Sequence, residues 1–326
     1  MENIFPHRPL GKSDLLVSPI GLGCWQFSKG RGPGAKFWPI LQDEEIKDIV
    51  RISLEGSINW FDTAEAYGGG ESEKALSKAL KSIGKSQEDV IIATKWMPFF
   101  RTAKSILKTI DKRLENLRDF RINLYQIHNP LSFSSTRAEM NAMAQLVKDQ
   151  KIRYIGVSNF SAKRMKTAQN ELSKHGLNLI SNQVLYNLLN RKIETNGILN
   201  TARELGISII AYSPLAQGLL SGKFHDNPKL IRSRPGYRKY IGAFKPKGLE
   251  KRRPVIKALK ELAEKYKATP AQVALNWIIS FHGDMIVAIP GATRSEQAKD
   301  NALSMKFKLS KDELDFLDEV STPFRS

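Results

Sequence analysis

"INWFDTAEAYGGGESEKAL", residues 58–76, contains one complete strand, loop and helix unit. An apolar run ends on the carboxylate of Asp62, and the phenol of Tyr67 follows five positions later. Three glycines then precede a stretch whose apolar residues have helical spacing, which indicates that the glycines form the turn into a helix. The stretch therefore predicts a strand with an acid at its C-terminal end and a tyrosine on the loop beyond it.

The same unit recurs along the chain. The predicted strands, all short and apolar on both faces, are 20–25, 58–63, 90–95, 122–128, 154–159, 179–184, 207–213 and 285–291. Eight such strands with helical patterns between them predict a (β/α)8 TIM barrel, as one domain over 1–326. A doubly wound sheet is the rival fold, but "GLGCWQ" (21–26) carries only the first two glycines of its nucleotide-binding fingerprint.

Helical patterns fill the intervals between the predicted strands. One helix opens on Asp43, a predicted N-cap, and closes on Gly56, the residue expected just past its end. The segments 105–117 and 138–151 repeat apolar residues at i, i+3, i+4 and i+7. A long basic loop is expected after the seventh strand, before a helix at 252–266.

The composition narrows the class of protein. The chain has 326 residues and no apolar run near the roughly 18 residues of a membrane helix, and its start lacks an apolar signal region. A single cysteine, Cys24, excludes an internal disulfide framework and a cysteine-based metal cluster. We therefore expect a soluble protein of a reducing compartment, the cytoplasm, with no membrane partner.

The formal net charge of +18 favours anionic partners such as nucleic acid, a membrane surface or phosphorylated small molecules. The densest basic run, 232–254, is either a solvated loop or an anion-binding segment. No zinc-finger or RNA-recognition motif accompanies it, so a dedicated nucleic-acid domain is not expected.

Polar side chains gather where the predicted strands end, the edge at which (β/α)8 barrels carry their chemistry. Asp62, Lys95 and His128 close the second, third and fourth strands. The later strand ends carry Ser158, Asn159, Gln183, Tyr212 and Ser213. Each residue alone has an ordinary structural explanation, such as a turn-capping aspartate or a core histidine. Together they predict one site, since burying Lys95 would be costly without a partner such as Asp62.

Tyr67 and this set could perform proton transfer. A free tyrosine has a pKa of about 10, and a nearby Lys95 ammonium would lower it. Asp62 would hold the ammonium, and a neutral His128 would orient a carbonyl oxygen, which makes Tyr67 a general acid. A metal site is the rival use of Asp62 and His128, but it lacks an obvious third ligand, so no metal is expected.

Further motifs follow in a fixed order along the chain. They are "RPLGKSDLLVSPIGLGCW" (8–25), "NWFDTAEAYG" (59–68), "IIATK" (91–95), "YQIHNP" (125–130), "IRYIGVSNF" (152–160), "SNQVLYN" (181–187), "IIAYSPLAQGLLSGK" (209–223) and "IPGATRSEQAKDN" (289–301). This series resembles the aldo-keto reductase family, in the branch of potassium-channel β-subunits and bacterial general reductases. The resemblance implies an N-terminal β-hairpin below the barrel and a catalytic tetrad of Asp62, Tyr67, Lys95 and His128. In that tetrad Tyr67 protonates the carbonyl oxygen while a nicotinamide delivers hydride.

The resemblance also implies NADP(H) as the cofactor. Ser158, Asn159 and Gln183 would hold its carboxamide beside Asp62, and Tyr212 would stack on the nicotinamide ring. The other implied contacts are Ser213, Leu215, Gln217, Gly218 and Lys223 along the pyrophosphate, and Gly291, Thr293, Arg294, Gln297, Asp300 and Asn301 towards the adenosine. Gln297 and Asn301 are four residues apart, so a helix there would place both on one face.

One position departs from many family members, which carry a lysine directly after the proline of the "IP" motif. This chain has Gly291 there. In the branch it resembles, other cations reach the 2′-phosphate, and here these would be Lys223, Arg234 and Arg294. Arginine can chelate phosphate through two nitrogens, so NADP is expected over NAD.

Trp25, Phe27, Trp96 and Phe99 lie at or just past strand ends, where they either shape a pocket for apolar or aromatic aldehydes and ketones or only pack. An NADPH-dependent carbonyl reductase is the leading hypothesis. A cofactor-binding regulatory or scaffold subunit is the alternative, because the tetrad is expected in both. The short segment before the first motif favours the enzyme, and the oligomeric state, monomer or homo-oligomer, stays open.

Overall fold

A computed structural model describes residues 4–32, 37–233 and 238–325, and a sheet of eight parallel strands forms its centre. In sheet order the strands are β3 (Leu22–Gly23), β4 (Trp60–Asp62), β5 (Ile91–Trp96), β6 (Leu124–Ile127), β7 (Tyr154–Ser158), β8 (Leu179–Leu185), β9 (Ser208–Tyr212) and β10 (Ile286–Ala288). Parallel bridges join Ile20 to Ala288 and Gly23 to Gly291, so the first and last strands meet. The sheet closes into a barrel, which confirms the predicted fold.

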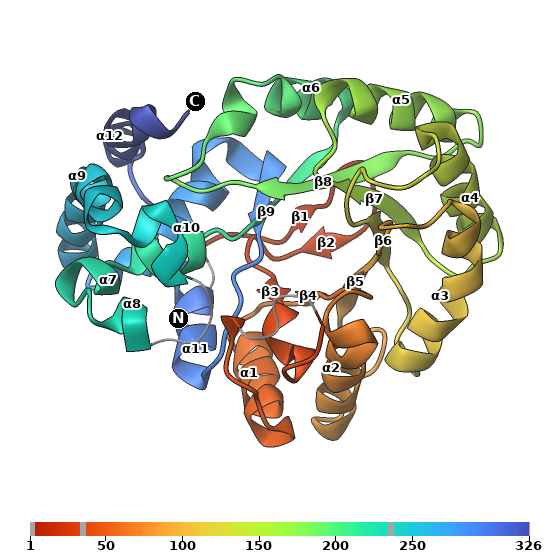
Figure 1. The fold of residues 1–326 in the computed structure, drawn as a ribbon, viewed down its shortest axis with the longest axis horizontal. Helices are drawn as coiled ribbons and strands as arrows, with labels where there is room; N and C mark the ends of the chain where they lie inside the picture. Colours follow the sequence, from red (N-terminus) through yellow and green to blue (C-terminus); the bar gives the residue numbers. More distant parts are fainter. Residues whose placement is uncertain (1–3, 33–36, 234–237, 326) are drawn as a thin grey trace.

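Helices surround the strands, as Figure 1 shows. In chain order they are α1 (Asp43–Glu55), α2 (Glu71–Ser82), α3 (Lys104–Leu117), α4 (Thr136–Lys148), α5 (Ala162–Ser173), α6 (Ile198–Leu205), α7 (Lys223–Asp226), α8 (Leu230–Ser233), α9 (Pro246–Lys265), α10 (Pro270–Phe281), α11 (Ser295–Leu303) and α12 (Lys311–Ser321). The prediction of Asp43 as the N-cap of α1 is wrong. Gln42 takes that place, because its side chain and that of Glu45 form a reciprocal capping box.

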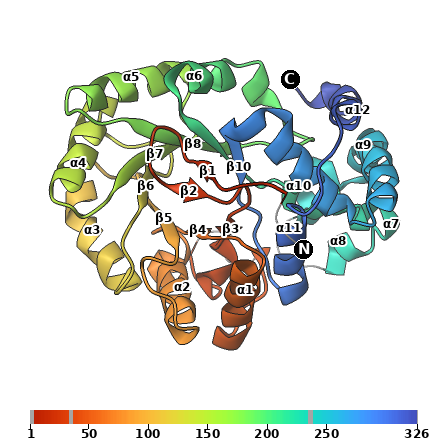
Figure 2. The ribbon, with the colours of Figure 1, turned by 180° about the vertical axis from the view of Figure 1, so that it is seen from behind.

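The predicted N-terminal hairpin is present and closes the bottom of the barrel. Its strands, β1 (Arg8–Pro9) and β2 (Leu16–Val17), pair antiparallel and lie across the centre of the barrel in Figure 2. Leu10, Leu15 and Val17 pack in one buried apolar cluster with side chains from six barrel strands. These barrel side chains are Trp60, Ala93, Leu124, Ile180, Ile210 and Val287.

A polar layer lies above this apolar layer because side chains alternate along each strand. Successive side chains of a strand point to opposite faces, so residues two apart share a face. On β5 the floor residue Ala93 is followed two positions later by Lys95, and on β4 Trp60 is followed by Asp62. The strands that fill the barrel below therefore also deliver ionisable groups to its mouth.

The long loop after β9 is present and contains α7, α8 and short 3₁₀ turns. Its residues Leu219, Phe224, Ile231 and Phe244 form a small apolar cluster with Leu249 of α9. In the parts of the chain that the structure describes, no helix is long and apolar enough to cross a membrane.

Candidate active site

Lys95 is the centre of the polar layer and is completely buried, with 0% of its side chain exposed. Its ammonium donates to Asp62 Oδ1, to the Thr63 carbonyl at 2.9 Å and to the Tyr67 hydroxyl at 3.3 Å. Burial lowers the pKa of Lys95, but attraction to Asp62 and Tyr67 outweighs it and leaves the pKa raised. Lys95 is therefore a fixed cation whose three donors are all used.

Asp62 is held by amides as well as by Lys95. Its Oδ2 accepts from Gln126 Nε2 at 3.0 Å and from Gln183 Nε2 at 2.8 Å. Gln126 was missed by sequence reasoning, although its polar side chain inside the apolar strand run 122–128 was a usable signal. These bonds satisfy a carboxylate that would otherwise be expensive to bury.

Tyr67 reaches this layer from the loop after β4. Its ring stacks on Trp25 with centroids 6.1 Å apart and lies edge-on to His128 at 5.7 Å. The following Gly68–Gly70 turn requires glycine, since Gly70 has φ 97° and an added Cβ would approach Asn116 Nδ2 to 2.3 Å. The glycines thus form the turn into α2, as predicted, and set the position of the phenol.

Lys95 acts on the pKa of Tyr67 in the expected direction, but the net shift of that pKa is upward instead of downward. Burial of the hydroxyl raises that pKa, and the opposing charge of Lys95 only reduces the increase. Tyr67 therefore remains a protonated phenol at neutral pH. Its oxygen accepts from Lys95, and within the described residues its own proton has no recorded acceptor.

His128 follows β6 and is partly buried beside Tyr67. Burial, and then the charge of Lys95, lower its pKa from 6.5 to about 3. The imidazole is therefore neutral at physiological pH, as the sequence predicts. Its Nδ1 is buried and has no hydrogen-bond partner within the described ranges.

A cavity of about 790 Å³ opens above this layer. The predicted site residues that line it are Trp25, Asp62, Tyr67, His128, Ser158, Asn159, Gln183, Tyr212, Ser213, Leu215, Gln217, Gly218, Lys223, Gly291, Thr293, Arg294, Gln297, Asp300 and Asn301. Lys95 lies behind Asp62 and Tyr67, and Arg234 lies outside the described residues.

Three predicted pocket aromatics do not line the cavity. Trp96 follows the inward-facing Lys95 on β5 and so points outward, where its Nε1 donates to Ser105 Oγ on α3 at 3.0 Å. Phe27 is fully buried in the core between strands and helices. Phe99 is 42% exposed on the loop after β5. The aromatic wall beside Trp25 is instead formed by Phe37 and Trp38, which sequence reasoning missed.

The chain matches the model of the aldo/keto reductase family over residues 19–322. This chain belongs to that family. It is 36% identical to an uncharacterized oxidoreductase of Mycobacterium tuberculosis over 311 residues, covering 95% of this chain and 91% of the relative. It is 30% identical to the chloroplastic pyridoxal reductase of Arabidopsis thaliana over 321 residues, covering 95% and 84%.

Solved structures agree with this assignment. A thermostable aldo-keto reductase crystallised with the inhibitor epalrestat superposes with a TM-score of 0.77 at 29% identity, covering 97% of this chain and 100% of that one. The glycerol dehydrogenase of Gluconobacter oxydans gives a TM-score of 0.83 at 26% identity, covering 98% and 95%. As an aldo/keto reductase, the chain is an oxidoreductase that acts on small-molecule carbonyl compounds with a nicotinamide cofactor.

The cavity of this aldo/keto reductase fits a polar cofactor of that kind. On its floor Tyr212 donates to Asn159 Oδ1 at 3.2 Å, and Asn159 donates to Ser158 Oγ at 3.1 Å. Asn159, Ser213 and Gln217 hold positive φ of 60°, 49° and 56°, a strain typical of ligand sites. Among the described residues Gln217 Oε1 is buried without a partner, an acceptor that a bound hydroxyl or amide would satisfy.

The far end of the cavity is bounded by α11. Gln297 Oε1 accepts from the Thr293 amide at 2.7 Å, and Asn301 lies one turn further on the same helix face, as predicted. Gly291 has a packing reason, because an added Cβ would come within 2.1 Å of Gln26 Nε2. Gln26 thus occupies the space in which a side chain at position 291 would begin.

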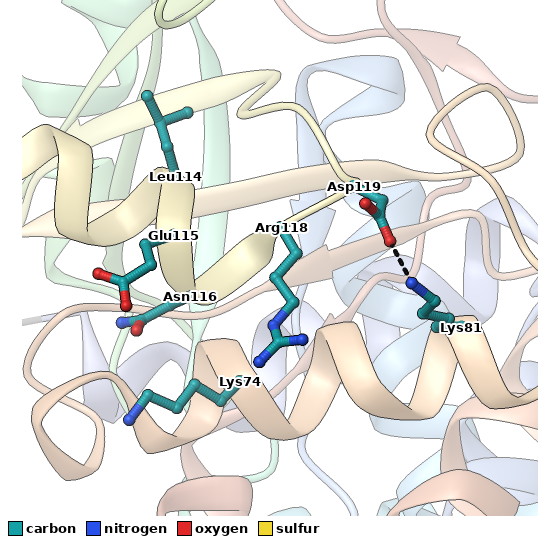
Figure 3. Close-up of a pocket in the computed structure, with 7 residues that line it drawn as sticks. All are labelled: Lys74, Lys81, Leu114, Glu115, Asn116, Arg118 and Asp119. Carbon is teal, nitrogen blue, oxygen red and sulfur yellow. Dashed lines mark hydrogen bonds and ion pairs between the residues drawn. The ribbon is translucent and has the colours of Figure 1, made fainter.

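A second hollow, of about 630 Å³, lies outside the barrel between α2 and α3 (Figure 3). Of its charged lining residues, Lys81 and Asp119 pair with each other at 2.7 Å, while Lys74 and Glu115 pair with neighbours on their own helices. No predicted site residue lines it. The cavity at the barrel mouth is therefore the candidate site.

Proposed function

We propose that this chain reduces aldehydes and ketones to alcohols with NADPH, and that Tyr67 donates the proton. The observation that carries the proposal is the Tyr67 hydroxyl, which accepts a hydrogen bond from the buried Lys95 at 3.3 Å at the floor of the cavity. The alternative is a regulatory or scaffold subunit that binds the same cofactor with little turnover.

The proton chemistry follows from the protonation states. Tyr67 stays a phenol because burial raises its pKa, so it enters the reaction carrying the proton that an alkoxide product needs. As Tyr67 begins to lose that proton, the Lys95 ammonium stabilises the developing phenolate, and Asp62 keeps the ammonium in place.

His128 completes the proton-donating end. With its pKa lowered to about 3, the imidazole is neutral and can donate one N–H to a carbonyl oxygen without competing as an acid. Its ring lies edge-on to Tyr67 at 5.7 Å, so both groups face the same part of the cavity. Two donors aimed at one oxygen would fix the carbonyl and polarise it.

NADP(H) would be held along the rest of the cavity. Ser158, Asn159 and Gln183 would bind the carboxamide, Tyr212 the ring, and the α11 end the adenosine. When bound, a reduced nicotinamide supplies the hydride that no side chain can supply. Lys223 and Arg294 line the cavity and would pair with a 2′-phosphate, and the expected contribution of Arg234 stays a prediction.

The substrate end is apolar. Trp25 stacks on Tyr67, and its ring centroid lies 6.0 Å from that of Phe37 and 5.9 Å from that of Trp38. Met97 lines the same cavity. Such a wall favours aromatic or apolar carbonyl compounds over small hydrophilic ones.

The direct test is NADPH oxidation with a panel of aromatic aldehydes, pyridoxal and short aliphatic aldehydes. Pyridoxal is included because the plant relative is a pyridoxal reductase. We expect turnover with the aromatic compounds at the highest kcat/KM. Tight NADPH binding without turnover of any member would favour the regulatory alternative. Epalrestat, the inhibitor crystallised with the structural relative, serves as an inhibition probe.

Cofactor choice needs its own measurement. Lys223→Met and Arg294→Met should each raise the Kd for NADPH about tenfold while changing that for NADH less than about twofold. The control is Lys229→Met. Lys229 is exposed on the loop after β9 that also carries Lys223, and it does not line the cavity, so this variant should change neither Kd. If wild type bound NADPH no more tightly than NADH, the preference for NADP would be refuted.

A further inference from the structure

A buried network of charges lies directly behind the Tyr67 loop. Arg113 of α3 pairs through Nε with Glu73 Oε2 at 2.8 Å and through Nη1 with Glu65 Oε1 at 3.2 Å. Arg113 and Glu73 are almost inaccessible, and Glu65 is buried as well. The two carboxylates flank Tyr67 in the chain, two residues before it and six residues after it.

Glu73 attaches this network to β5 on one side of Lys95. The Thr94 hydroxyl donates to Glu73 Oε1 at 2.6 Å, and Asn116 Nδ2 donates to Oε2 at 2.8 Å. Thr94 precedes Lys95 on the strand and faces outward where Lys95 faces inward. Asn116 also lines the outer hollow of Figure 3, so the network spans the layer between barrel and surface.

Glu65 attaches the network to β5 on the other side of Lys95. The Met97 amide donates to Glu65 Oε2 at 3.0 Å, and the Glu65 amide donates to the Lys95 carbonyl at 3.1 Å. Arg101 adds a bond to Glu65 Oε1 at 2.6 Å. The loop that carries Tyr67 is thus tied to the strand that carries Lys95, before and after the lysine.

From this arrangement we infer that Glu65, Arg113 and Glu73 form a positioning clamp that sets the contact between Lys95 and Tyr67. The inference rests on the proposed role of Tyr67 as proton donor. At 3.3 Å that contact is already long for a hydrogen bond, so a small shift of the loop would uncouple the ammonium from the phenol. None of the three clamp residues lines the cavity, and among the described residues the one cavity residue that they hydrogen-bond directly is Met97, through its backbone amide.

The chain contains a matched control network. Arg191 pairs with Glu194 at 2.7 Å and with Asp318 of α12, and it is equally buried. None of these three residues lines the cavity. Arg113 and Arg191 are thus both buried guanidinium groups between two carboxylates, one behind the Tyr67 loop and one beside the last helix. Beside the last helix, Arg325 also pairs with Glu194 and Asp318.

The experiment compares Arg113→Met with Arg191→Met in the full chain. Arg113→Met should lower kcat about tenfold or more, while KM for the carbonyl and Kd for NADPH change less than about threefold. Arg191→Met should lower the melting temperature to a similar degree and leave kcat within about twofold. Arg113→Lys, which keeps the charge, should recover part of the loss. Wild-type kcat in Arg113→Met, or an equal loss in Arg191→Met, would overturn the clamp.

Thr94→Val covers the case in which Arg113→Met does not fold. It removes only the hydroxyl that ties Glu73 to β5, and we expect kcat to fall about threefold or more with KM unchanged. An unchanged kcat in Thr94→Val would also count against the clamp.

A spectroscopic readout separates this inference from the proposed function. In isotope-labelled tyrosine spectra, the Tyr67 resonance is identified by its loss in Tyr67→Phe. Arg113→Met and Thr94→Val should shift that resonance, whereas Arg191→Met should not. These shifts are expected even if the protein turns over no carbonyl compound. Absence of turnover would refute the proposed function and leave the clamp standing. An unmoved Tyr67 resonance in both clamp variants would refute the clamp alone.

Discussion

The two ends of the barrel are built on the same strands but differ in chemistry. At the bottom, Leu10, Leu15 and Val17 of the hairpin seal the barrel against an apolar layer that includes Trp60. At the mouth, two residues further along β4, Asp62 joins a polar layer under a cavity of about 790 Å³. The bottom stabilises the fold by burying apolar side chains, whereas the mouth carries buried charges that destabilise the fold but serve the chemistry.

A buried cation at each end shows the difference. Arg8 Nη1, at the bottom, donates to the backbone carbonyls of Ile279, Gly283 and Ile286 at 3.1, 3.3 and 3.2 Å. Lys95, at the mouth, bonds to two titratable side chains, Asp62 and Tyr67. Arg8 also pairs with Asp284 at 3.4 Å, but that carboxylate is exposed to solvent. The backbone carbonyls cannot change charge, so Arg8 is mainly a structural cation, whereas buried Lys95 can respond when Tyr67 gives up a proton.

The largest effect is expected at the mouth, from Tyr67→Phe. Loss of the proton donor should lower kcat about 10³-fold, within the range for general acids. The free energy of unfolding should change by less than about 1 kcal/mol, since one hydrogen bond from Lys95 is lost. NADPH oxidation and urea unfolding measure the two quantities. Wild-type turnover in this variant would show that Tyr67 is not the donor.

Lys95→Met should lower kcat about 10²-fold and also destabilise the fold by about 4 kcal/mol, because Asp62 is left buried and unpaired. The double variant Asp62→Asn with Lys95→Met removes both charges. It should regain most of the unfolding free energy and none of the activity. Recovery of turnover in the double variant would mean that the pair only supports the fold.

The bottom of the barrel should show the opposite pattern. Leu10→Ala removes a side chain that is 0% exposed and should cost about 3 kcal/mol of unfolding free energy, with kcat unchanged at a temperature where the variant is folded. Leu16→Ala, at a position 54% exposed on the same hairpin, should cost less than about 0.5 kcal/mol. A drop in kcat for Leu10→Ala would contradict the separation of the two ends.

The fold could be predicted because the signals were local. Each strand is a short apolar run bounded by turn residues, and their regular recurrence specifies the barrel. The N-cap of α1 was misplaced by one residue because Gln42 competes with Asp43 through a capping box that depends on Glu45. Such a choice depends on side-chain geometry that composition alone does not reveal.

The site was predictable where motif and strand end coincide, and less so elsewhere. Trp96 was assigned to the pocket although strand alternation after an inward Lys95 points it outward. Phe37 and Trp38 lie far from the strand ends in sequence and reach the cavity only through the fold. The sign of the Tyr67 pKa shift required the balance of burial against charge, which depends on three-dimensional position.

The smallest effect is a difference in pH sensitivity between the two ends. The folded state holds His128 with a pKa of about 3, against 6.5 for the free side chain. Below pH 6.5 the unfolded chain therefore takes up a proton that the folded chain does not, so stability falls as the pH decreases. Because the ring borders the cavity and its solvent, the loss between pH 6.5 and 4.5 should be at most about 2 kcal/mol.

Comparing wild type with His128→Asn across that window isolates the imidazole, because acids such as Glu73, whose pKa is raised by burial, are present in both proteins. Glu194, whose pKa is lowered from 4.5 to about 2, adds stability that is lost only as the pH falls below about 4.5. His225 also has a lowered pKa, but wild type and the His128→Asn variant both contain it, so its contribution cancels when the two are compared. Thermal unfolding of wild type and His128→Asn across the window should therefore give a smaller decrease for the variant. At the bottom of the barrel Arg8 stays charged throughout this pH range. The Leu10→Ala variant should therefore lose stability with decreasing pH as steeply as wild type. A shallower pH dependence in Leu10→Ala would mean that the sensitivity lies at the bottom of the barrel and not at the mouth.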